Sequence, residues 1–208
     1  EQYCTRILQW QEKALREAKL RTTWSDPNSD YESACRQHVE YLLLADAGAP
    51  LRDEIATAAA ELAPAGALNS LAQSLLRMTT PGVPDLYQGA EYWDFSLVDP
   101  DNRRPVDFAA RQHSLSSAGP LDELLQSWHD GRIKQAVIRR TLQLRRRYPR
   151  LFSEGRYLPL AVSGEQAEQL LAFARELAVH WVVVAVPRLA GQKTNNEGVR
   201  ALMRQHRP

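Results

Sequence analysis

Residues 79–107 read TTPGVPDLYQGAEYWDFSLVDPDNRRPVD, and this stretch decides the predicted fold. Its early part, residues 83–87, is short, apolar and bounded by proline and glycine, which favours a buried strand. The part that follows, residues 88–105, is a loop of polar, charged and aromatic residues. Loops on a rigid scaffold carry binding and catalytic residues more often than the scaffold does. We therefore expect function to lie in this loop.

Helical patterns dominate the chain before this stretch. Apolar residues at helical spacing predict helices over residues 1–20, 30–45, 50–62 and 65–78. Pro64 is expected to separate the last two, because an interior proline removes a backbone hydrogen bond from a helix. Either Asp26 or Ser29 is the expected cap of the second helix.

The chain after the stretch changes from helix to strand. Helices are predicted over residues 108–117, 121–128 and 132–148, and β segments over residues 156–162, 169–175 and 180–187. We read the β segments as consecutive antiparallel strands of a second domain, with the boundary near Pro149. The predicted domains are therefore residues 1–149 and residues 150–208, and the chain as a whole is mostly helical.

Composition excludes several classes of protein. Lys and Arg number 26 against 25 Asp and Glu, so we expect no nucleic-acid partner and no membrane partner. Two cysteines and five scattered histidines lack the spacing of a metal site, and neither a metal nor a cofactor is expected. No apolar run approaches the ~18 residues of a membrane span, which predicts a soluble, cytoplasmic protein. The arginines at residues 139–147 are expected to form a solvated helix face.

Two motifs in the stretch carry a family resemblance. Helix, short strand, long loop and helix is the order of one βα unit of a TIM barrel. PGVPDLYQGAE at residues 81–91 resembles the eighth strand of the α-amylase family barrel, whose usual form is PGxPxxYxGxE. VDPDNRRPVD at residues 98–107 is similar to the DPxNRRP loop of several members. With LREAK, TTWSDPN and YE upstream, the chain resembles the maltooligosyltrehalose synthases, a group within this family.

The resemblance covers about residues 3–189 and implies both a fold and an activity. The implied fold is the last part of a (β/α)8 barrel followed by a truncated antiparallel β C-terminal domain, whose tail departs from the family's β-rich ending. The implied activity is an intramolecular transglucosylation of a maltooligosaccharide, which moves the reducing-end glucose from an α-1,4 to an α,α-1,1 linkage. No cofactor is implied.

The resemblance also implies that the catalytic acids are absent. The family uses an aspartate nucleophile, a glutamate acid/base and a second aspartate, on strands that precede the region present in this chain. No acid in the chain matches those motifs, so we expect no catalytic residue and no turnover from these 208 residues alone. Because the chain begins at Glu1, it is expected to be processed or a piece of a longer protein. A partial barrel predicts a partner, either the missing N-terminal barrel portion or a second copy.

The loop supplies the aromatic faces and polar groups that a sugar site needs. The predicted substrate-binding residues are Tyr87, Gln88, Glu91, Asp99, Asp101, Asn102, Arg103 and Arg104. Structural alternatives stay open: Glu91 as a brace, Tyr87 as a core residue, and Asp101 with Asn102 as a turn. Ion pairs between the two arginines and the neighbouring aspartates are expected to stiffen the loop, with one arginine on substrate or an acid.

Other residues are weaker candidates. Trp93 is expected to pack rather than to stack on sugar, and Trp24, Asn28 and Tyr31 form a second, less favoured cluster. Two rival functions also stay open, namely another α-amylase-family hydrolase or transferase of maltooligosaccharides, and a non-catalytic structural fragment. The products formed from a maltooligosaccharide separate these alternatives.

Overall fold

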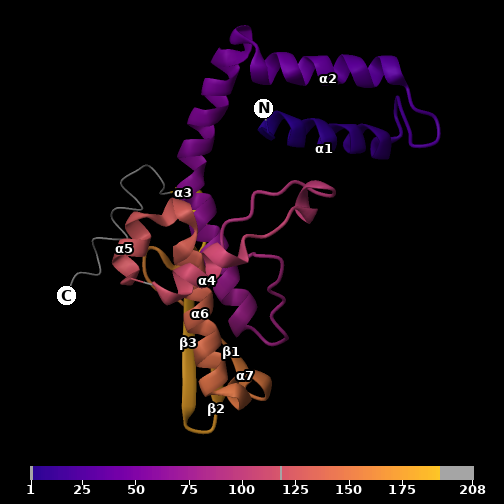
Figure 1. Cartoon of the computed structure of the whole chain (residues 1–208). Helices are drawn as coiled ribbons and strands as arrows, with labels where there is room; N and C mark the ends of the chain where they lie inside the picture. Colours follow the sequence, from indigo (N-terminus) through magenta and orange to yellow (C-terminus); the bar gives the residue numbers. More distant parts are fainter. Residues whose placement is uncertain (1, 118, 193–208) are drawn as a thin grey trace. The chain divides into compact units, whose positions relative to one another are not determined.

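The computed structural model describes residues 2–117 and 119–192 (Figure 1). The chain divides into two compact units, one formed by Glu1–Ala60 with Phe95–Pro105 and the other by Glu61–Asp94 with Val106–Pro208. The candidate stretch at residues 79–107 therefore contributes to both units.

The first unit is built on paired helices. It contains α1 (Gln2–Ala18), α2 (Ser29–Leu44), η1 (Asp46–Gly48), the first part of α3 (Ala49–Thr79) and η2 (Asp101–Arg103). Helices α1 and α2 lie against each other, and Arg16 of α1 donates to both carboxylate oxygens of Glu32 of α2 at 2.8 and 2.7 Å. Thr22 of the connecting turn donates to the same carboxylate, so three segments meet at Glu32.

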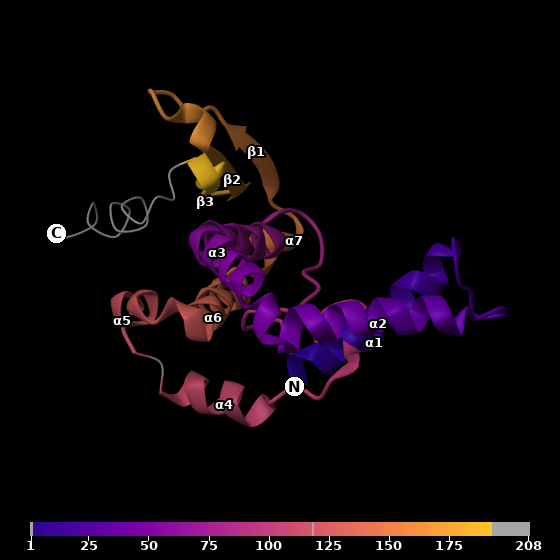
Figure 2. The same cartoon turned by 90° about the horizontal axis from the view of Figure 1, so that it is seen from above.

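The second unit combines helices with one small sheet. After the second part of α3 come α4 (Phe108–Ser116), α5 (Leu121–Gln126), η3 (Trp128–Asp130), α6 (Arg132–Arg147) and α7 (Pro149–Ser153). The strands are β1 (Arg156–Leu160), β2 (Leu170–Leu177) and β3 (His180–Pro187), with η4 (Ala167–Gln169) and η5 (Ala190–Gln192) beside them. Helix α6 contacts α4 and α5 (Figure 2).

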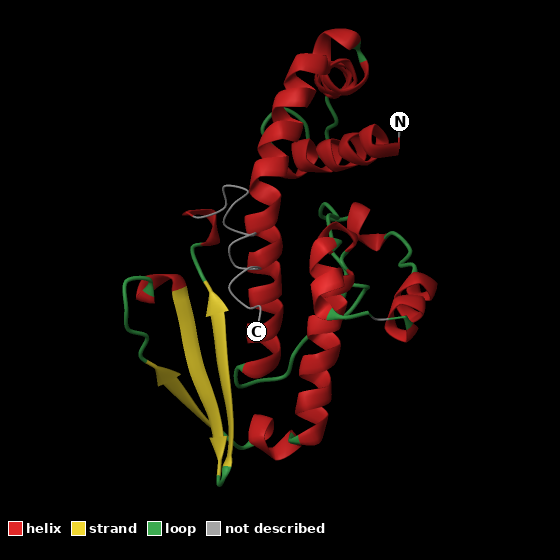
Figure 3. Ribbon diagram, turned by 90° about the vertical axis from the view of Figure 1, so that its left-hand side faces the viewer, coloured by secondary structure: helices red, strands yellow, loops and turns green. Residues whose placement is uncertain are grey.

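The core of the second unit lies between the sheet and α3. The strands pair antiparallel in the order β1-β2-β3, with Phe173 opposite Val184 on the next strand. Phe173, Val184 and Val186 form a cluster with Ala72, which places the sheet along the C-terminal part of α3 (Figure 3). The small Ala72 lets the sheet approach the helix closely, and Phe173 with the two valines fills the space between them.

The predicted helices and the three antiparallel strands are confirmed, with shifts of a few residues at their ends. Three details of the helices differ. Asn28, rather than Asp26 or Ser29, caps α2, because its side chain accepts a hydrogen bond from the backbone nitrogen of Tyr31 at 3.1 Å. Pro149 ends α6 as predicted but also begins α7, since proline suits the first turn of a helix.

The third difference is that Pro64 does not interrupt the helix. Helix α3 is continuous over 31 residues with Pro64 inside it. Proline removes only one donor, and the segments on either side are rich in alanine, leucine and other strong helix formers. Helix propensity on both sides therefore outweighs the local cost at Pro64.

Residues 83–87 do not form the predicted buried strand. The sheet of the described residues contains only β1, β2 and β3, and the segment leaves Val83 95% and Tyr87 60% exposed. A strand needs a neighbour to satisfy its backbone groups, and the described part of the chain places none beside this segment. The (β/α)8 barrel and the domain boundary near Pro149 accordingly stay predictions.

Candidate functional site

The part of the stretch in the second unit, residues 87–93, forms a turn that α4 and α6 hold in place. Arg111 of α4 donates from Nε and Nη2 to the Gly89 carbonyl at 3.2 and 2.7 Å. Lys134 of α6 donates from Nζ to the Tyr92 carbonyl at 3.1 Å. Gly89 has φ 77°, and a Cβ there would lie 2.4 Å from Val106 Cγ1, so only glycine fits. The turn is therefore preorganised.

Aromatic packing adds to this support. The Trp93 indole donates to the Trp128 carbonyl at 2.7 Å, and the two rings meet edge to face at 6.4 Å. The Tyr92 hydroxyl donates to Ser114 at 2.6 Å. Burial lowers the pKa of Lys134, partly offset by the nearby Asp94 carboxylate. Trp93 thus packs, as expected.

The three predicted site residues on this turn differ in their surroundings. Tyr87 and Gln88 are exposed within the described residues. Gln88 has φ 53°, in the left-handed region that side chains other than glycine rarely adopt. Backbone outliers such as Gln88 gather at functional sites. Glu91 is half-buried, and its carboxylate lies 3.5 Å from Arg111 Nε, which fits a role in bracing the turn.

The part of the stretch in the first unit, residues 95–105, is organised around Asp101. Arg6 of α1 donates to both carboxylate oxygens at 2.8 and 2.9 Å and to the Phe95 carbonyl at 3.1 Å. The Leu97 backbone nitrogen donates to Asp101 at 2.7 Å, and Arg104 Nε lies 3.0 Å from the same carboxylate. Asp101 is only 5% exposed, and the Arg6 guanidinium holds its pKa well below the usual range.

The remaining predicted residues surround this centre. Asp99 forms ion pairs with Arg103 and, at 3.5 Å, with Lys13, which confirms the predicted pairing of the arginines with neighbouring aspartates. The side chain of Arg103 is nevertheless 76% exposed, and Asn102 and Arg104 are also exposed. The loop thus keeps polar groups on its surface while its carboxylates are engaged internally.

Sequence reasoning missed the support residues. Arg6 lies 95 positions from Asp101, and Arg111 and Lys134 lie 22 and 42 positions from the carbonyls they bind. Arg6 and Arg111 each lie within a helix, and nothing in the neighbouring sequence indicates which loop they contact. In the weaker cluster, Asn28 serves as a helix cap, while Trp24 stays exposed, with its indole on Glu17 at 3.2 Å.

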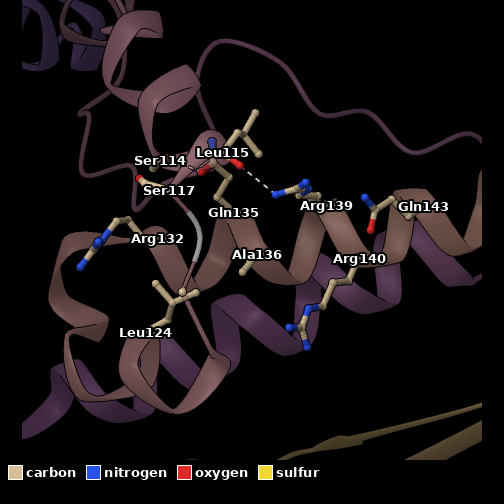
Figure 4. Close-up of a pocket in the computed structure, with 11 residues that line it drawn as sticks. Ser114, Leu115, Ser117, Leu124, Arg132, Gln135, Ala136, Arg139, Arg140 and Gln143 are labelled. Carbon is tan, nitrogen blue, oxygen red and sulfur yellow. Dashed lines mark hydrogen bonds between the residues drawn. The ribbon is translucent and has the colours of Figure 1, made fainter.

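Within residues 2–117 and 119–192, hollows also occur outside the predicted site residues. One, of about 300 Å³, lies between α1 and α2. Another, of about 210 Å³, lies among α4, α5 and α6 (Figure 4). In the described residues, no cluster of His, Cys, Asp and Glu has the makings of a metal site. None of the helices in residues 2–117 and 119–192 is long and apolar enough to cross a membrane.

Comparisons with known proteins connect the chain to one family. No protein-family model matches it. Curated proteins from two strains of Mycobacterium tuberculosis, both assigned by name to maltooligosyl trehalose synthase, are 39% identical over 170 residues, which is 82% of this chain and 20% of theirs. The chain therefore spans about a fifth of the length of the curated relatives it matches.

Solved structures agree. A crystal structure of maltooligosyl trehalose synthase matches 90% of this chain and 25% of its own, with a TM-score of 0.77 and 30% identity. The enzyme of that name from Arthrobacter ramosus matches 96% of this chain and 24% of its own, with a TM-score of 0.72 and 36% identity. By sequence and by fold, the chain belongs to the maltooligosyl trehalose synthase family, and it corresponds to a part of that family's longer chains.

Proposed function

We propose that the chain forms part of an enzyme that converts the reducing-end α-1,4 linkage of a maltooligosaccharide into an α,α-1,1 linkage by intramolecular transglucosylation. The observation that carries the proposal is similarity over most of the chain, at 39% identity, to curated proteins named for this activity. Structures of the same name match up to 96% of the chain. In these terms the enzyme is an isomerase.

The 208 residues would supply a wall of the sugar site. Tyr87 offers an exposed aromatic face and Gln88 an exposed amide, and both leave a turn that α4 and α6 hold rigid. A fixed ring and amide bind a sugar ring and its hydroxyls without a large loss of side-chain entropy. The left-handed backbone of Gln88 is the local outlier that a binding role would explain.

The loop at residues 95–105 would supply further polar contacts. Asn102, Arg103 and Arg104 are exposed and carry donors suited to sugar hydroxyls. Asp101 serves this role indirectly, since its carboxylate is buried and already engaged by Arg6. We assign Asp99 and Glu91 mainly to bracing, with their remaining oxygen lone pairs available to substrate.

The proposed reaction needs groups that this chain is not expected to hold. A retaining mechanism uses a nucleophilic carboxylate and an acid/base carboxylate about 5–5.5 Å apart. We place these on the part of the family-length chain that lies outside these 208 residues, and this part would also be the principal partner. Water must be kept from the glycosyl intermediate, and the preorganised loop would help to exclude it.

The proposal is tested by the products formed from maltopentaose. The enzyme that contains these residues within a family-length chain should convert maltopentaose into a non-reducing isomer, detected as loss of reducing ends at constant mass. Replacing Tyr87 by alanine should raise KM by about ten- to hundredfold, since burying an aromatic ring contributes about 1.5–3 kcal/mol. The control is Tyr41→Ala, which removes a tyrosine of similar exposure from α2.

Other outcomes point to the rival functions. Release of glucose or maltose would identify a hydrolase of the same family. If the family-length chain does not act on maltooligosaccharides, the result would support the rival hypothesis of a non-catalytic structural role. For the isolated 208 residues we expect no turnover, and a trehalose-type product from them alone would refute the placement of the carboxylates.

A further inference from the structure

The hollow among α4, α5 and α6 has a composition that separates it from the predicted sugar loop. Its volume is about 210 Å³, and none of the eight predicted substrate-binding residues lines it. The lining consists of Ser114, Leu115, Ser117, Gly119, Leu124, Arg132, Gln135, Ala136, Arg139, Arg140 and Gln143. The lining includes arginines but no aspartate and no glutamate. The hollow therefore favours an anion.

Helix α6 supplies the cationic side. Arg132, Ala136, Arg140 and Gln143 are spaced by three or four residues, so they follow one face of the helix, and Arg139 precedes Arg140 directly. Figure 4 shows Arg139, Arg140 and Gln143 in succession along this helix. Arg139 and Arg140 are exposed, as expected for a solvated face, and they also line this hollow.

The polar groups at the base of the hollow already form hydrogen bonds with one another. Ser114 donates to the buried Gln135 at 2.5 Å, and the Gln135 amide donates to the Arg111 carbonyl at 3.0 Å. Leu124 of α5 is 4% exposed and forms an apolar wall together with Leu115. A ligand therefore meets an apolar surface on one side and guanidinium groups on the other.

Charge in the hollow is only partly compensated. Arg132 is neutralised by Asp130, whose carboxylate lies 2.7 Å from its Nε. Arg139 uses one donor on the Leu115 carbonyl at 2.9 Å, shown dashed in Figure 4, and keeps its positive charge. Within residues 2–117 and 119–192, Arg140 has no ion pair and no hydrogen bond. In the described part of the chain, Arg139 and Arg140 thus bring positive charge without an ion-pair partner to the lining, while the Glu123 carboxylate lies close to Gly119, another lining residue.

We propose that this hollow binds the phosphate group of a small phosphate monoester, with Arg139 and Arg140 as its cationic contacts and Leu115 and Leu124 against its organic part. A guanidinium fork matches phosphate oxygens in pairs, and a phosphate monoester carries a charge of about −1.5 to −2 at neutral pH. The volume is below the roughly 300–1,000 Å³ of drug-sized pockets, which limits the organic part to a small group such as one sugar ring. The inference is independent of the proposed transglucosylation.

The test is a titration of the 208-residue chain with glucose 6-phosphate, inorganic phosphate and glucose, followed by calorimetry and by amide chemical shifts. Glucose 6-phosphate should bind with shifts at α4 and α6, and glucose should not. Affinity should rise between about pH 5 and pH 7, as the second phosphate proton with pKa near 6 is lost. Equal affinity for inorganic phosphate would retain the phosphate site and identify free phosphate as its ligand.

Matched variants decide whether the hollow itself is responsible. Arg140→Gln should weaken binding of glucose 6-phosphate by about tenfold, as expected when one charge-assisted hydrogen bond is removed. The control is Arg146→Gln, which removes an exposed arginine of the same helix that does not line the hollow. Equal weakening by both variants, or no saturable binding by the wild-type chain, would overturn the proposal. Both side chains are exposed, so circular dichroism should show an unchanged fold.

Discussion

Replacing Arg175 by methionine should lower the free energy of unfolding of the second unit by about 2–4 kcal/mol. Arg175 lies on β2 and is 1% exposed. Its guanidinium donates to the Thr79 carbonyl at the end of α3 at 3.1 Å, and to the Phe152 and Gly155 carbonyls around the end of α7 at 2.9 Å each. One side chain therefore joins the sheet to the ends of both helices.

The magnitude comes from two opposing effects. Hydrogen bonds from a charged donor contribute about 1.5–3 kcal/mol each, so the three bonds together contribute about 4.5–9 kcal/mol. Against this, burying a guanidinium without a carboxylate costs several kcal/mol. The lowered pKa of Arg175, caused by burial and then by the nearby Arg145, has the same physical origin. With this cost taken as about 2.5–5 kcal/mol, since Arg175 Nε is also buried without an acceptor among the described residues, the bonds exceed it by about 2–4 kcal/mol.

The assay is urea unfolding followed by circular dichroism, with Arg156→Met as the matched control. Arg156 belongs to the same sheet, but its side chain is 71% exposed and forms a surface ion pair with Glu176 at 2.8 Å. Such a pair contributes about 0–1 kcal/mol, so the control should unfold close to the wild type. An Arg175→Met variant as stable as the wild type would refute the reasoning, since desolvation would then outweigh the three bonds.

Three further predictions concern other contacts. Phe173→Ala should cost about 3–5 kcal/mol in urea unfolding, since Phe173 is fully buried against the helix, and a loss below about 1 kcal/mol would contradict the core assignment. Hydrogen bonds from Arg16 lower the pKa of Glu32 from 4.5 to about 2. The stability that the Glu32 carboxylate contributes is therefore present above about pH 4.5 and is lost as the pH falls towards 2. The free energies of unfolding of the wild type and of Glu32→Gln should accordingly converge over this pH range. Asp101→Asn should lower the thermal midpoint, because Arg6 loses its charged acceptor, and an unchanged midpoint would argue against Asp101 as the centre of the loop.

The helices and strands were largely predictable because their signals are local. Apolar spacing marked α6, and the run HWVVVAVP at residues 180–187 matched β3 at both ends. The failures have physical reasons too. Pro64 lies within a helix that strong helix formers on both sides maintain, and residues 83–87 have the composition of a strand without a partner beside them in the described part of the chain.

The candidate site was predictable in its position but not in its internal contacts. The turn and the ion pairs of residues 99–104 could be read from neighbouring residues. The expected substrate roles of the eight loop residues stay predictions. The departure of the tail from the family's ending, beyond residue 192, lies outside the described residues.

The amino-acid order by itself determined the types of most elements, the antiparallel order of the strands and the family resemblance, since these depend on periodicity, turn residues and short motifs. Only the tertiary structure decided which charged groups are buried. Asp101 became a structural centre because Arg6, from another helix, reaches it, and Arg175 became a link between sheet and helices because three distant carbonyls converge on it. A charged side chain reads as solvated in a local pattern, and only contacts between distant segments can provide the partners that compensate its burial.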